Sequence, residues 1–316
     1  MDSKLSIILL ALVMFSYEGC GVRLGAFNIQ VLGTTKMKKA DVVEILVDTI
    51  GRYDLLLIQE IRDSTGTAID DLLEEVNTKF SDNPFTLTIS PRLGRTNSKE
   101  QYAFLFREKS GITLLDYHVY NDTAVNTEAT DYDIFEREPI VALFQSTTTT
   151  IKKFALIGIH VAPSDAVKEL QALEVVFAQT KARLNIDDVM VLGDLNADCS
   201  YVANKYWVDI PIKNDPDYTW WIGDDIDTTV GNTNCAYDRF ISTGDLLKAS
   251  VEDGSASIFK YDDAFKLNQT MALKVSDHYP IEMILKGDTS GSSIPCMNNY
   301  CIFGLVLCTI LSIVLG

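Results

Sequence analysis

Short runs of branched and aromatic residues recur through the middle of the chain, and they restrict its fold more than any other feature. Such runs are typical of buried β-strands. Helical periodicity is less frequent and predicts three helices, at residues 37–50, 67–80 and 165–183. Because strands outnumber helices, the sequence favours an α+β fold in which two sheets pack face to face between outer helices, rather than a doubly wound parallel sheet. The predicted strands are residues 23–30, 55–59, 85–90, 102–106, 140–144, 154–160, 189–192, 237–241 and 281–285.

The chain of 316 residues is strongly acidic, with 27 Lys and Arg against 44 Asp and Glu and a net charge of −17. This charge excludes general electrostatic adhesion to nucleic acid or to an anionic membrane. A phosphate-containing substrate would have to meet local positive charge, either from individual arginines or from a bound metal ion. Apolar residues make up 47% of the chain, which allows a large core and excludes disorder as the main state.

The N-terminal segment has the features of a secretory signal. Residues 5–15 are uninterrupted apolar or small residues behind Lys4, and small residues follow at Ser16, Gly19 and Gly21. The apolar run is too short to span a bilayer. We therefore expect a signal peptide over residues 1–21, with a buried first strand or helix as the alternative.

The C-terminal segment has the pattern of a glycosylphosphatidylinositol (GPI) attachment signal. Residues 301–316 form an uncharged apolar tail, preceded by a spacer and by small residues at Ser290, Gly291 and Ser292. The tail lacks the length and the flanking basic residues of a stop-transfer helix. We expect residues 287–316 to direct attachment at Ser290, Gly291 or Ser292 and to anchor the protein to the outer leaflet of the cell surface. A direct membrane tail or a buried helix is the structural alternative, and secretion or the endomembrane lumen is the alternative location.

Removal of both ends would leave Cys199 and Cys235 in residues 22–286, which we expect to form one domain. In an oxidising compartment two such thiols pair and close a loop of about 37 residues, which contributes about 3–4 kcal/mol in the chain-entropy model. Metal binding by this pair is the weaker alternative, because no His or third Cys lies nearby in the sequence. Asn121 and Asn268 each begin a glycosylation sequon.

Polar side chains stand at the ends of several predicted strands, where a single such residue is usually a cap or a turn residue. Asp, Glu and Asn supply the oxygen ligands that a hard divalent cation needs. Imidazoles need carboxylates to orient them and to balance their charge. Together the strand ends predict a metal-assisted phosphoester site. The residues concerned are Asn28, Glu60, His160, Asp194 with Asn196, Asp238, and Asp277 with His278.

From Leu24 to Leu285 the chain resembles the deoxyribonuclease I family of the endonuclease/exonuclease/phosphatase superfamily. The resemblance implies a four-layer sandwich of two packed mixed β-sheets flanked by helices. It also implies a monomeric, divalent-metal-dependent endonuclease that hydrolyses double-stranded DNA to 5′-phosphate products. With its signal and anchor patterns, the chain is most similar to the membrane-associated members. The superfamily is marked by Gly193-Asp194-x-Asn196 and Ser276-Asp277-His278, and the deoxyribonuclease I branch by Leu93-Gly94-Arg95, Arg137-Glu138-Pro139 and Cys235-Ala236-Tyr237-Asp238-Arg239.

The resemblance implies two histidine–carboxylate pairs, His160 with Glu100 and His278 with Asp238. These pairs would act as general acid and base around an activated water, and which histidine has which role stays open. Two further residues would contact the scissile phosphate and the attacking water and stabilise the charge that develops on phosphorus. They are Asp194 and Asn196.

The resemblance also implies metal sites. Asn28 and Glu60 match the positions that bind the catalytic Mg²⁺ or Mn²⁺, and Asp277 lies close to the same site. Structural Ca²⁺ would bind at two other places. Asp227 and Thr229 match one calcium site, in which Gly231 stands where the family often has a Thr ligand, and Asp133 is a candidate ligand of the second.

Three arginines, Arg62, Arg95 and Arg137, match residues on the DNA-facing side of the family. Each could contact a phosphate or enter the minor groove. Ser98 stands where the family has a Tyr against the sugar, a difference that bears on affinity and sequence preference rather than on the chemistry.

Two other functions are compatible with parts of the sequence. A lipid phosphodiesterase of the same superfamily, such as a sphingomyelinase, would suit the membrane anchor, but Arg62, Arg95 and the Cys199 and Cys235 neighbourhoods favour a deoxyribonuclease. A non-catalytic binding protein, for example an adhesion or actin-binding module, is the third hypothesis. The complete set of histidines and carboxylate partners argues against it.

Overall fold

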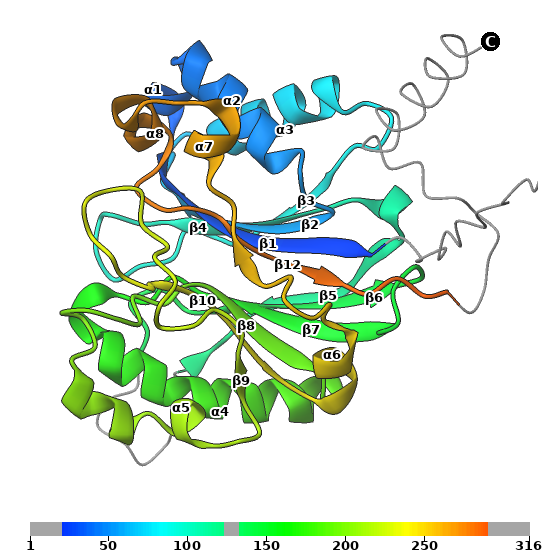
Figure 1. The fold of residues 1–316 in the computed structure, drawn as a ribbon, viewed down its shortest axis with the longest axis vertical. Helices are drawn as coiled ribbons and strands as arrows, with labels where there is room; N and C mark the ends of the chain where they lie inside the picture. The colour runs from blue at the N-terminus through cyan, green and yellow to red at the C-terminus, as the bar shows by residue number, and fades with distance from the viewer. Residues whose placement is uncertain (1–20, 123–132, 290–316) are drawn as a thin grey trace, which may run out of the picture.

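We describe residues 21–122 and 133–289 of the computed structural model. They form two six-stranded β-sheets that pack face to face, with helices on the outer side of each sheet (Figure 1). This four-layer sandwich confirms the predicted fold class. Within the described ranges, no helix is both long and apolar enough to cross a membrane. The signal segment up to residue 20 and the candidate GPI residues Ser290, Gly291 and Ser292 lie outside these ranges.

The first sheet has the strand order β11-β12-β1-β2-β4-β3. Its central strands β1 and β2 run parallel, with Asn28 opposite Gln59, and the other neighbouring strands pair antiparallel. The antiparallel β3–β4 pair joins the predicted strands 85–90 and 102–106. The strands are β1 (Val22–Leu32), β2 (Leu55–Ile61), β3 (Thr86–Ile89), β4 (Gln101–Phe106), β11 (Ser257–Ile258) and β12 (Ile281–Leu285).

The second sheet has the order β5-β6-β7-β8-β10-β9. It also contains one central parallel pair, β7 and β8, between antiparallel neighbours. Each sheet therefore has a pair of strands whose carboxyl ends lie side by side. The strands are β5 (Ile112–Val119), β6 (Ile140–Ser146), β7 (Lys153–Gly158), β8 (Val189–Asp194), β9 (Thr219–Trp220) and β10 (Asp238–Thr243).

Helices cover the outer face of each sheet (Figure 1). The predicted helices 67–80 and 165–183 correspond to α3 and α4 to within one residue at each end. The predicted start of helix 37–50 is wrong, because Lys39 has a non-helical ψ of 88° and Met37 ends a separate turn. The first sheet carries α1 (Thr34–Met37), α2 (Ala40–Ile50), α3 (Ala68–Lys79), α7 (Tyr261–Phe265) and α8 (Gln269–Val275), the second carries α4 (Ala166–Leu184) and α5 (Pro211–Asn214), and α6 (Asp245–Ser250) follows β10.

The central strands are buried on both faces, which explains their nearly continuous apolar sequences. In β2, Leu55 and Leu57 belong to the core between the sheets, whereas Leu56 and Ile58 pack into the core beneath α2 and α3. Full burial of one such side chain contributes about 1.5–3 kcal/mol. The sandwich therefore holds the ends of its central strands rigidly, and these ends carry the polar residues singled out in the sequence.

Candidate active site

Polar side chains from the two sheets meet at the ends of the central strands. Asn28 lies in β1 where its regular pairing with β2 stops. Its Nδ2 donates to Glu60 Oε1 at 3.0 Å and to Asp194 Oδ2 at 3.1 Å. Glu60 belongs to β2 of the same sheet, whereas Asp194 ends β8 of the other sheet. Packing of the sheets thus brings together residues that are 166 positions apart in the chain.

Two buried histidines converge on the Asp194 carboxylate. The Nδ1 atom of His160 lies 2.9 Å from Glu100 Oε2, and that of His278 lies 2.7 Å from Asp238 Oδ2. Their Nε2 atoms lie 3.4 Å and 3.5 Å from Asp194 Oδ2. A carboxylate at Nδ1 fixes the ring and leaves Nε2 to exchange a proton. The two pairs implied by the family resemblance are therefore present and face the same carboxylate.

The charges in this cluster depend on one another. Burial by itself would lower the pKa of His278, but the Asp238 and Asp194 carboxylates outweigh it and raise that pKa well above its usual value. Burial would raise the pKa of Asp194, but His278 and His160 lower it overall. For Glu100, His160 and two nearby arginines likewise overcome burial and lower the pKa. The cluster therefore stabilises carboxylates beside a protonated His278.

We call Asn28, Glu60 and Asp277 the oxygen corner, because Asn28 contacts Glu60 and Asp277 follows Ser276, whose Oγ donates to the Asn28 backbone oxygen. Glu60 Oε2 accepts the Val31 backbone N–H at 3.0 Å, and Asp277 Oδ1 is buried with no hydrogen-bond donor among the described residues. Asn28 Oδ1 accepts a single bond, from Gln30 N–H at 3.0 Å, and a carbonyl oxygen has two lone pairs. Two carboxylates and an amide oxygen with spare lone pairs fit a hard divalent cation such as Mg²⁺ or Mn²⁺.

Asn196 is held in a left-handed conformation just beyond β8, with φ of 46°. Its backbone N–H donates to Asp194 Oδ1 at 3.0 Å, and its Nδ2 donates to Val161 O at 2.9 Å. These bonds fix the side-chain amide next to Asp194 and to the segment that follows His160.

The three predicted DNA-facing arginines differ in exposure. Arg62 is part-exposed, bonds to Ser98 Oγ and has its Nε 4.0 Å from Glu100. Arg95 is exposed and paired with Glu136 at 2.9 Å. Arg137 is only 8% exposed, so protein covers most of its side chain.

Arg137 supports the first histidine pair from behind. Its Nε and Nη2 donate to the backbone oxygen of His160 at 3.1 Å and 3.0 Å, and its Nη1 lies 3.5 Å from Glu100 Oε1. The fully buried Glu169 of α4 accepts the backbone N–H groups of Glu136 at 3.0 Å and Ala162 at 3.2 Å. Burial raises the pKa of Glu169 to about 7. Sequence inspection missed Glu169, since nothing local distinguishes it on an amphipathic helix.

The predicted disulfide is present between Cys199 and Cys235, whose Cα atoms lie 5.9 Å apart. It joins the loop after β8 to the segment before β10, close to Asp194 and Asp238. The alternative of metal binding by these two cysteines is therefore wrong.

Three carboxylates converge around Asp133, one of the predicted calcium ligands. Asp122, Asp133 and Glu138 bring one oxygen each to within 4.8 Å of one another, and Asp122 Oδ1 is buried without a donor among the described residues. Burial, and then Asp122 and Asp133, raises the pKa of Glu138, as expected for crowded like charges. Of this group only Asp133 was predicted. Glu138 lies in a motif that was recognised but given no role.

At the other predicted calcium position, Asp227 Oδ1 accepts bonds from Thr229 N–H at 3.0 Å, from Thr229 Oγ1 at 2.7 Å and from Cys235 N–H at 3.2 Å. Asp227 is thus held in place by its own loop. Gly231 in the same loop is exposed and offers no side-chain ligand.

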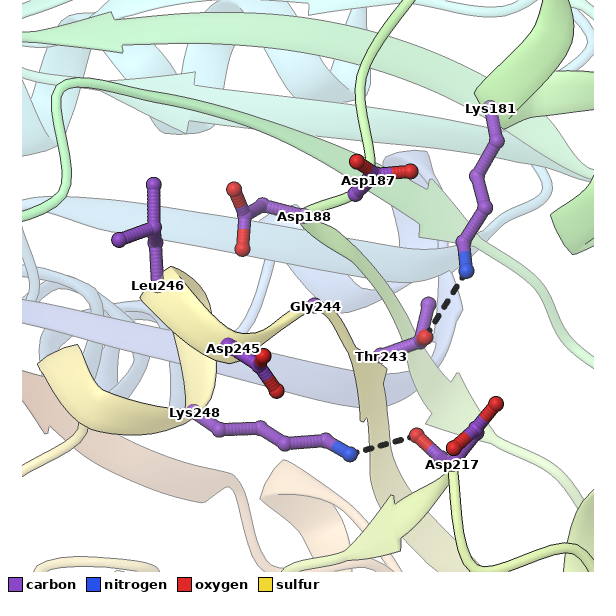
Figure 2. Close-up of a pocket in the computed structure, with 9 residues that line it drawn as sticks. All are labelled: Lys181, Asp187, Asp188, Asp217, Thr243, Gly244, Asp245, Leu246 and Lys248. Carbon is purple, nitrogen blue, oxygen red and sulfur yellow. Dashed lines mark hydrogen bonds between the residues drawn. The ribbon is translucent and has the colours of Figure 1, made fainter.

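A hollow of about 370 Å³ lies at the opposite end of β8 and β10 from the histidines (Figure 2). Thr243 pairs with Val189 there, five residues of register away from the Asp238–Asp194 pair. The Lys181 ammonium in this hollow bonds to Thr243 Oγ1 at 2.9 Å, and that of Lys248 bonds to the Asp217 backbone oxygen at 2.6 Å (Figure 2). These lysines already have protein partners, so the hollow does not compete with the histidine cluster as a candidate active site.

Both predicted glycosylation residues are exposed, which is compatible with modification. Asn268 also caps α8, where its Oδ1 accepts the Met271 N–H at 2.9 Å.

The profile of the Endonuclease/Exonuclease/phosphatase family matches residues 25–278. Deoxyribonuclease-1 of Bos taurus is 41% identical over 283 residues, which cover 90% of this chain and 99% of the bovine protein. Deoxyribonuclease-1 of Homo sapiens is 39% identical over 283 residues, with the same coverage of 90% and 99%.

Solved structures share the fold at low sequence identity. A Bacteroides thetaiotaomicron protein of the endonuclease/exonuclease/phosphatase family superposes with a TM-score of 0.56 at 12% identity, over 86% of this chain and 100% of the other. Truncated TDP2 of Caenorhabditis elegans gives a TM-score of 0.54 at 14% identity, over 85% and 99%. The sandwich, the matched profile and the similarity to the deoxyribonuclease-1 sequences agree. The chain therefore belongs to the endonuclease/exonuclease/phosphatase family and, within it, to the deoxyribonuclease I family.

Proposed function

We propose that the protein is a divalent-metal-dependent endonuclease that hydrolyses phosphodiester bonds of double-stranded DNA to 5′-phosphate products. The convergence of the His160–Glu100 and His278–Asp238 pairs on Asp194 carries the proposal. Phosphodiester hydrolysis needs one group that takes a proton from water and one that gives a proton to the leaving oxygen, and two oriented imidazoles supply both. The similarity to the bovine and human deoxyribonuclease-1 sequences supports DNA as the substrate.

We assign the general acid to His278. Its raised pKa keeps Nε2 protonated at neutral pH, so that it can protonate the departing 3′ oxygen. We assign the general base to His160, because Glu100 holds its Nδ1 and leaves Nε2 to accept a proton from the attacking water. Asp194 and Asn196 would orient that water and the scissile phosphate between the two rings.

The oxygen corner would hold the metal ion through Asn28, Glu60 and Asp277. A bound Mg²⁺ or Mn²⁺ would neutralise the phosphodiester and stabilise the charge that develops on its oxygens. This contribution matters in a chain with a net charge of −17, which has little other means of attracting a phosphate.

Arg62 and Arg95 would bind the DNA backbone or minor groove beside the cluster. Both side chains reach the solvent, and Arg62 also lies 4.0 Å from the buried Glu100 of the first histidine pair, which supports this role. The Arg137 side chain is largely covered by protein and bonds to His160 and Glu100. We propose that it contacts DNA while it keeps these bonds, so that it also holds the first histidine pair in place.

We further propose structural Ca²⁺ at the Asp122, Asp133 and Glu138 group and at Asp227 with Thr229. The first group is supported by three converging carboxylates, which without a cation would repel one another. The second is supported by an aspartate that its loop holds in place.

The protein is expected to act as a monomer on the outer cell surface, as a membrane-associated member of its family. A signal peptide over residues 1–21, a catalytic domain over residues 22–286 and GPI attachment at Ser290, Gly291 or Ser292 would place it there, and the disulfide is compatible with the secretory pathway. Treatment of intact cells with a phosphatidylinositol-specific phospholipase C should release nuclease activity. Retention on cells, with peptides from residue 301 onward in the mature protein, would contradict GPI attachment.

A plasmid-nicking assay tests the nuclease activity. Activity should require Mg²⁺ or Mn²⁺, disappear with excess chelator and fall by about 10²–10⁴-fold in His160→Ala, since general acid–base catalysis contributes about that much. His118→Ala is the matched control, because His118 lies on the outermost strand of the second sheet. Full activity in chelator, or equal rates for the two variants, would contradict the proposal. Sphingomyelin measured alongside should not be hydrolysed.

A further inference from the structure

Lys36 lies in α1, the short helix that follows β1, and is buried there, with only 7% of its surface accessible. Its Nζ donates to the backbone oxygens of Ile29 at 2.5 Å, Gln30 at 2.5 Å and Val275 at 2.7 Å. An ammonium group has three N–H donors, so each donor has an acceptor. Burial lowers the pKa of Lys36 to about 8, which leaves the group mostly protonated at pH 7. The three bonds are therefore charge-assisted.

Two of the carbonyls that Lys36 binds, those of Ile29 and Gln30, lie at a strained turn of the backbone near the end of β1. Gln30 and Val31 have φ of 46° and 57°, in the left-handed region that side chains avoid. Val31 is β-branched and 46% exposed, so little packing compensates for its strain. Such conformations persist only where surrounding bonds determine them.

The opposite edge of the same turn contacts the oxygen corner. The Gln30 N–H donates to Asn28 Oδ1, and the Val31 N–H donates to Glu60 Oε2, each at 3.0 Å. The turn therefore presents its amides to two proposed metal ligands while Lys36 holds its carbonyls. Displacement of the turn would move both ligands.

The third bond of Lys36 reaches the end of α8. Val275 is the last residue of this helix, and Ser276 Oγ donates to the Asn28 backbone oxygen at 2.7 Å. Asp277, the third member of the oxygen corner, follows directly. Lys36 thus connects two of the three chain segments that supply the corner, those of Asn28 and Asp277.

We propose that Lys36 is a positioning residue of the oxygen corner: its ammonium holds the Gln30–Val31 turn against the end of α8 and so fixes Asn28, Glu60 and Asp277 for a divalent cation. The inference rests on the proposed metal site. Residues that support metal ligands in this way typically change metal affinity about 10–100-fold when they are replaced.

The test compares Lys36→Met with Lys38→Met, which removes the same charge from an exposed lysine two residues away. Mn²⁺ binding to the DNA-free protein is measured by electron paramagnetic resonance at pH 7. The bound Mn²⁺ that is present in wild type and absent from Glu60→Gln is the ion at the oxygen corner. Lys36→Met should weaken binding of that ion about 10–100-fold and raise the Mg²⁺ concentration for half-maximal nicking by a similar factor. At saturating Mg²⁺ its kcat should return to within about threefold of wild type, because Lys36 touches no reacting group. Lys38→Met should match wild type.

A purely structural role would lower the melting temperature without changing Mn²⁺ affinity, and that result would overturn the proposal. Lys36→Gln retains two N–H donors and serves if Lys36→Met does not fold; its Mn²⁺ affinity should fall between those of wild type and Lys36→Met. Failure of both variants to fold would also overturn it, since Lys36 would then be needed for the fold itself. If wild type bound Mn²⁺ at the corner but cut no DNA, the proposed nuclease activity would be refuted. The Mn²⁺ affinities of wild type and Lys36→Met would still decide whether Lys36 positions the corner.

Discussion

Replacement of Asp238 by Asn removes one charge from the second histidine pair with almost no change of shape. Asp238 is fully buried, and its Oδ2 lies 2.7 Å from His278 Nδ1. An Asn amide at this place either donates to Nδ1 or accepts from it, and in both cases it leaves the imidazolium without its closest counter-charge.

The size of the effect follows from that contact. Loss of one partner from a buried, hydrogen-bonded charge pair costs about 3–5 kcal/mol. In the transition state His278 donates a proton to the leaving oxygen. If this cost destabilises the transition state, kcat/KM should fall by about 10²–10⁴-fold, since each 1.4 kcal/mol is a factor of ten. The unfolding free energy of the protein should fall by less than this amount, because the substitution also removes a like charge next to Asp194.

The pH dependence adds an independent check. Asp238 and Asp194 both raise the pKa of His278, so Asp238→Asn should lower that pKa toward its usual value. Because the general acid acts in its protonated form, the basic limb of the kcat/KM profile should move to lower pH. Nicking rates between pH 5 and 10, with far-ultraviolet circular dichroism as the folding control, measure both effects. A folded variant with a near wild-type rate, or with an unmoved basic limb, would refute the assignment of His278 as the acid.

Three other predictions concern residues outside the histidine pairs. Arg62→Ala should weaken DNA binding and reduce its salt dependence by about one charge, while hydrolysis of a small phosphodiester stays nearly unchanged; equal losses on both substrates would place Arg62 in the chemistry. The pKa of Glu169 rises from 4.5 to about 7 on folding, so wild type should lose up to about 3 kcal/mol of unfolding free energy relative to Glu169→Gln as the pH rises between these values. Urea titrations of both proteins at pH 4.5 and 7.5 measure this loss. The same difference in unfolding free energy between wild type and Glu169→Gln at the two pH values would contradict the prediction. Ca²⁺ should raise the melting temperature of wild type more than that of Asp122→Asn, and an identical response would exclude Asp122 as a ligand.

The fold was largely predictable because the central strands are buried on both sides. Residues 55–59 and 189–192 are apolar at every position except Gln59, and strands of this kind stand out in any sequence. The edge strands were harder to identify. Strand β5 is mostly part-exposed and was not among the predicted strands, while β9 and β11 contain two residues each and have no measurable periodicity.

The site was predictable where its residues stand at strand ends or in family motifs, as Asn28, Asp194 and His278 do. Burial of Arg137 could not be predicted, because it depends on the fold bringing residues 137, 160 and 100 together. The burial of Lys36 could not be predicted either. One of its partners, Val275, lies 239 residues away in the chain, a distance over which local sequence carries no signal.

The order of the strands also has a consequence for biosynthesis. Strand β12 is the last of the sandwich in the chain, yet it pairs with β1, the first, and lies inside the first sheet. His278 comes only three residues before it. A growing polypeptide therefore has neither the His278 imidazole nor a complete first sheet until nearly all of the domain has left the ribosome. Fragments from premature termination before residue 278 should be unable to cut DNA, so the direction of translation itself delays the activity until the product is whole.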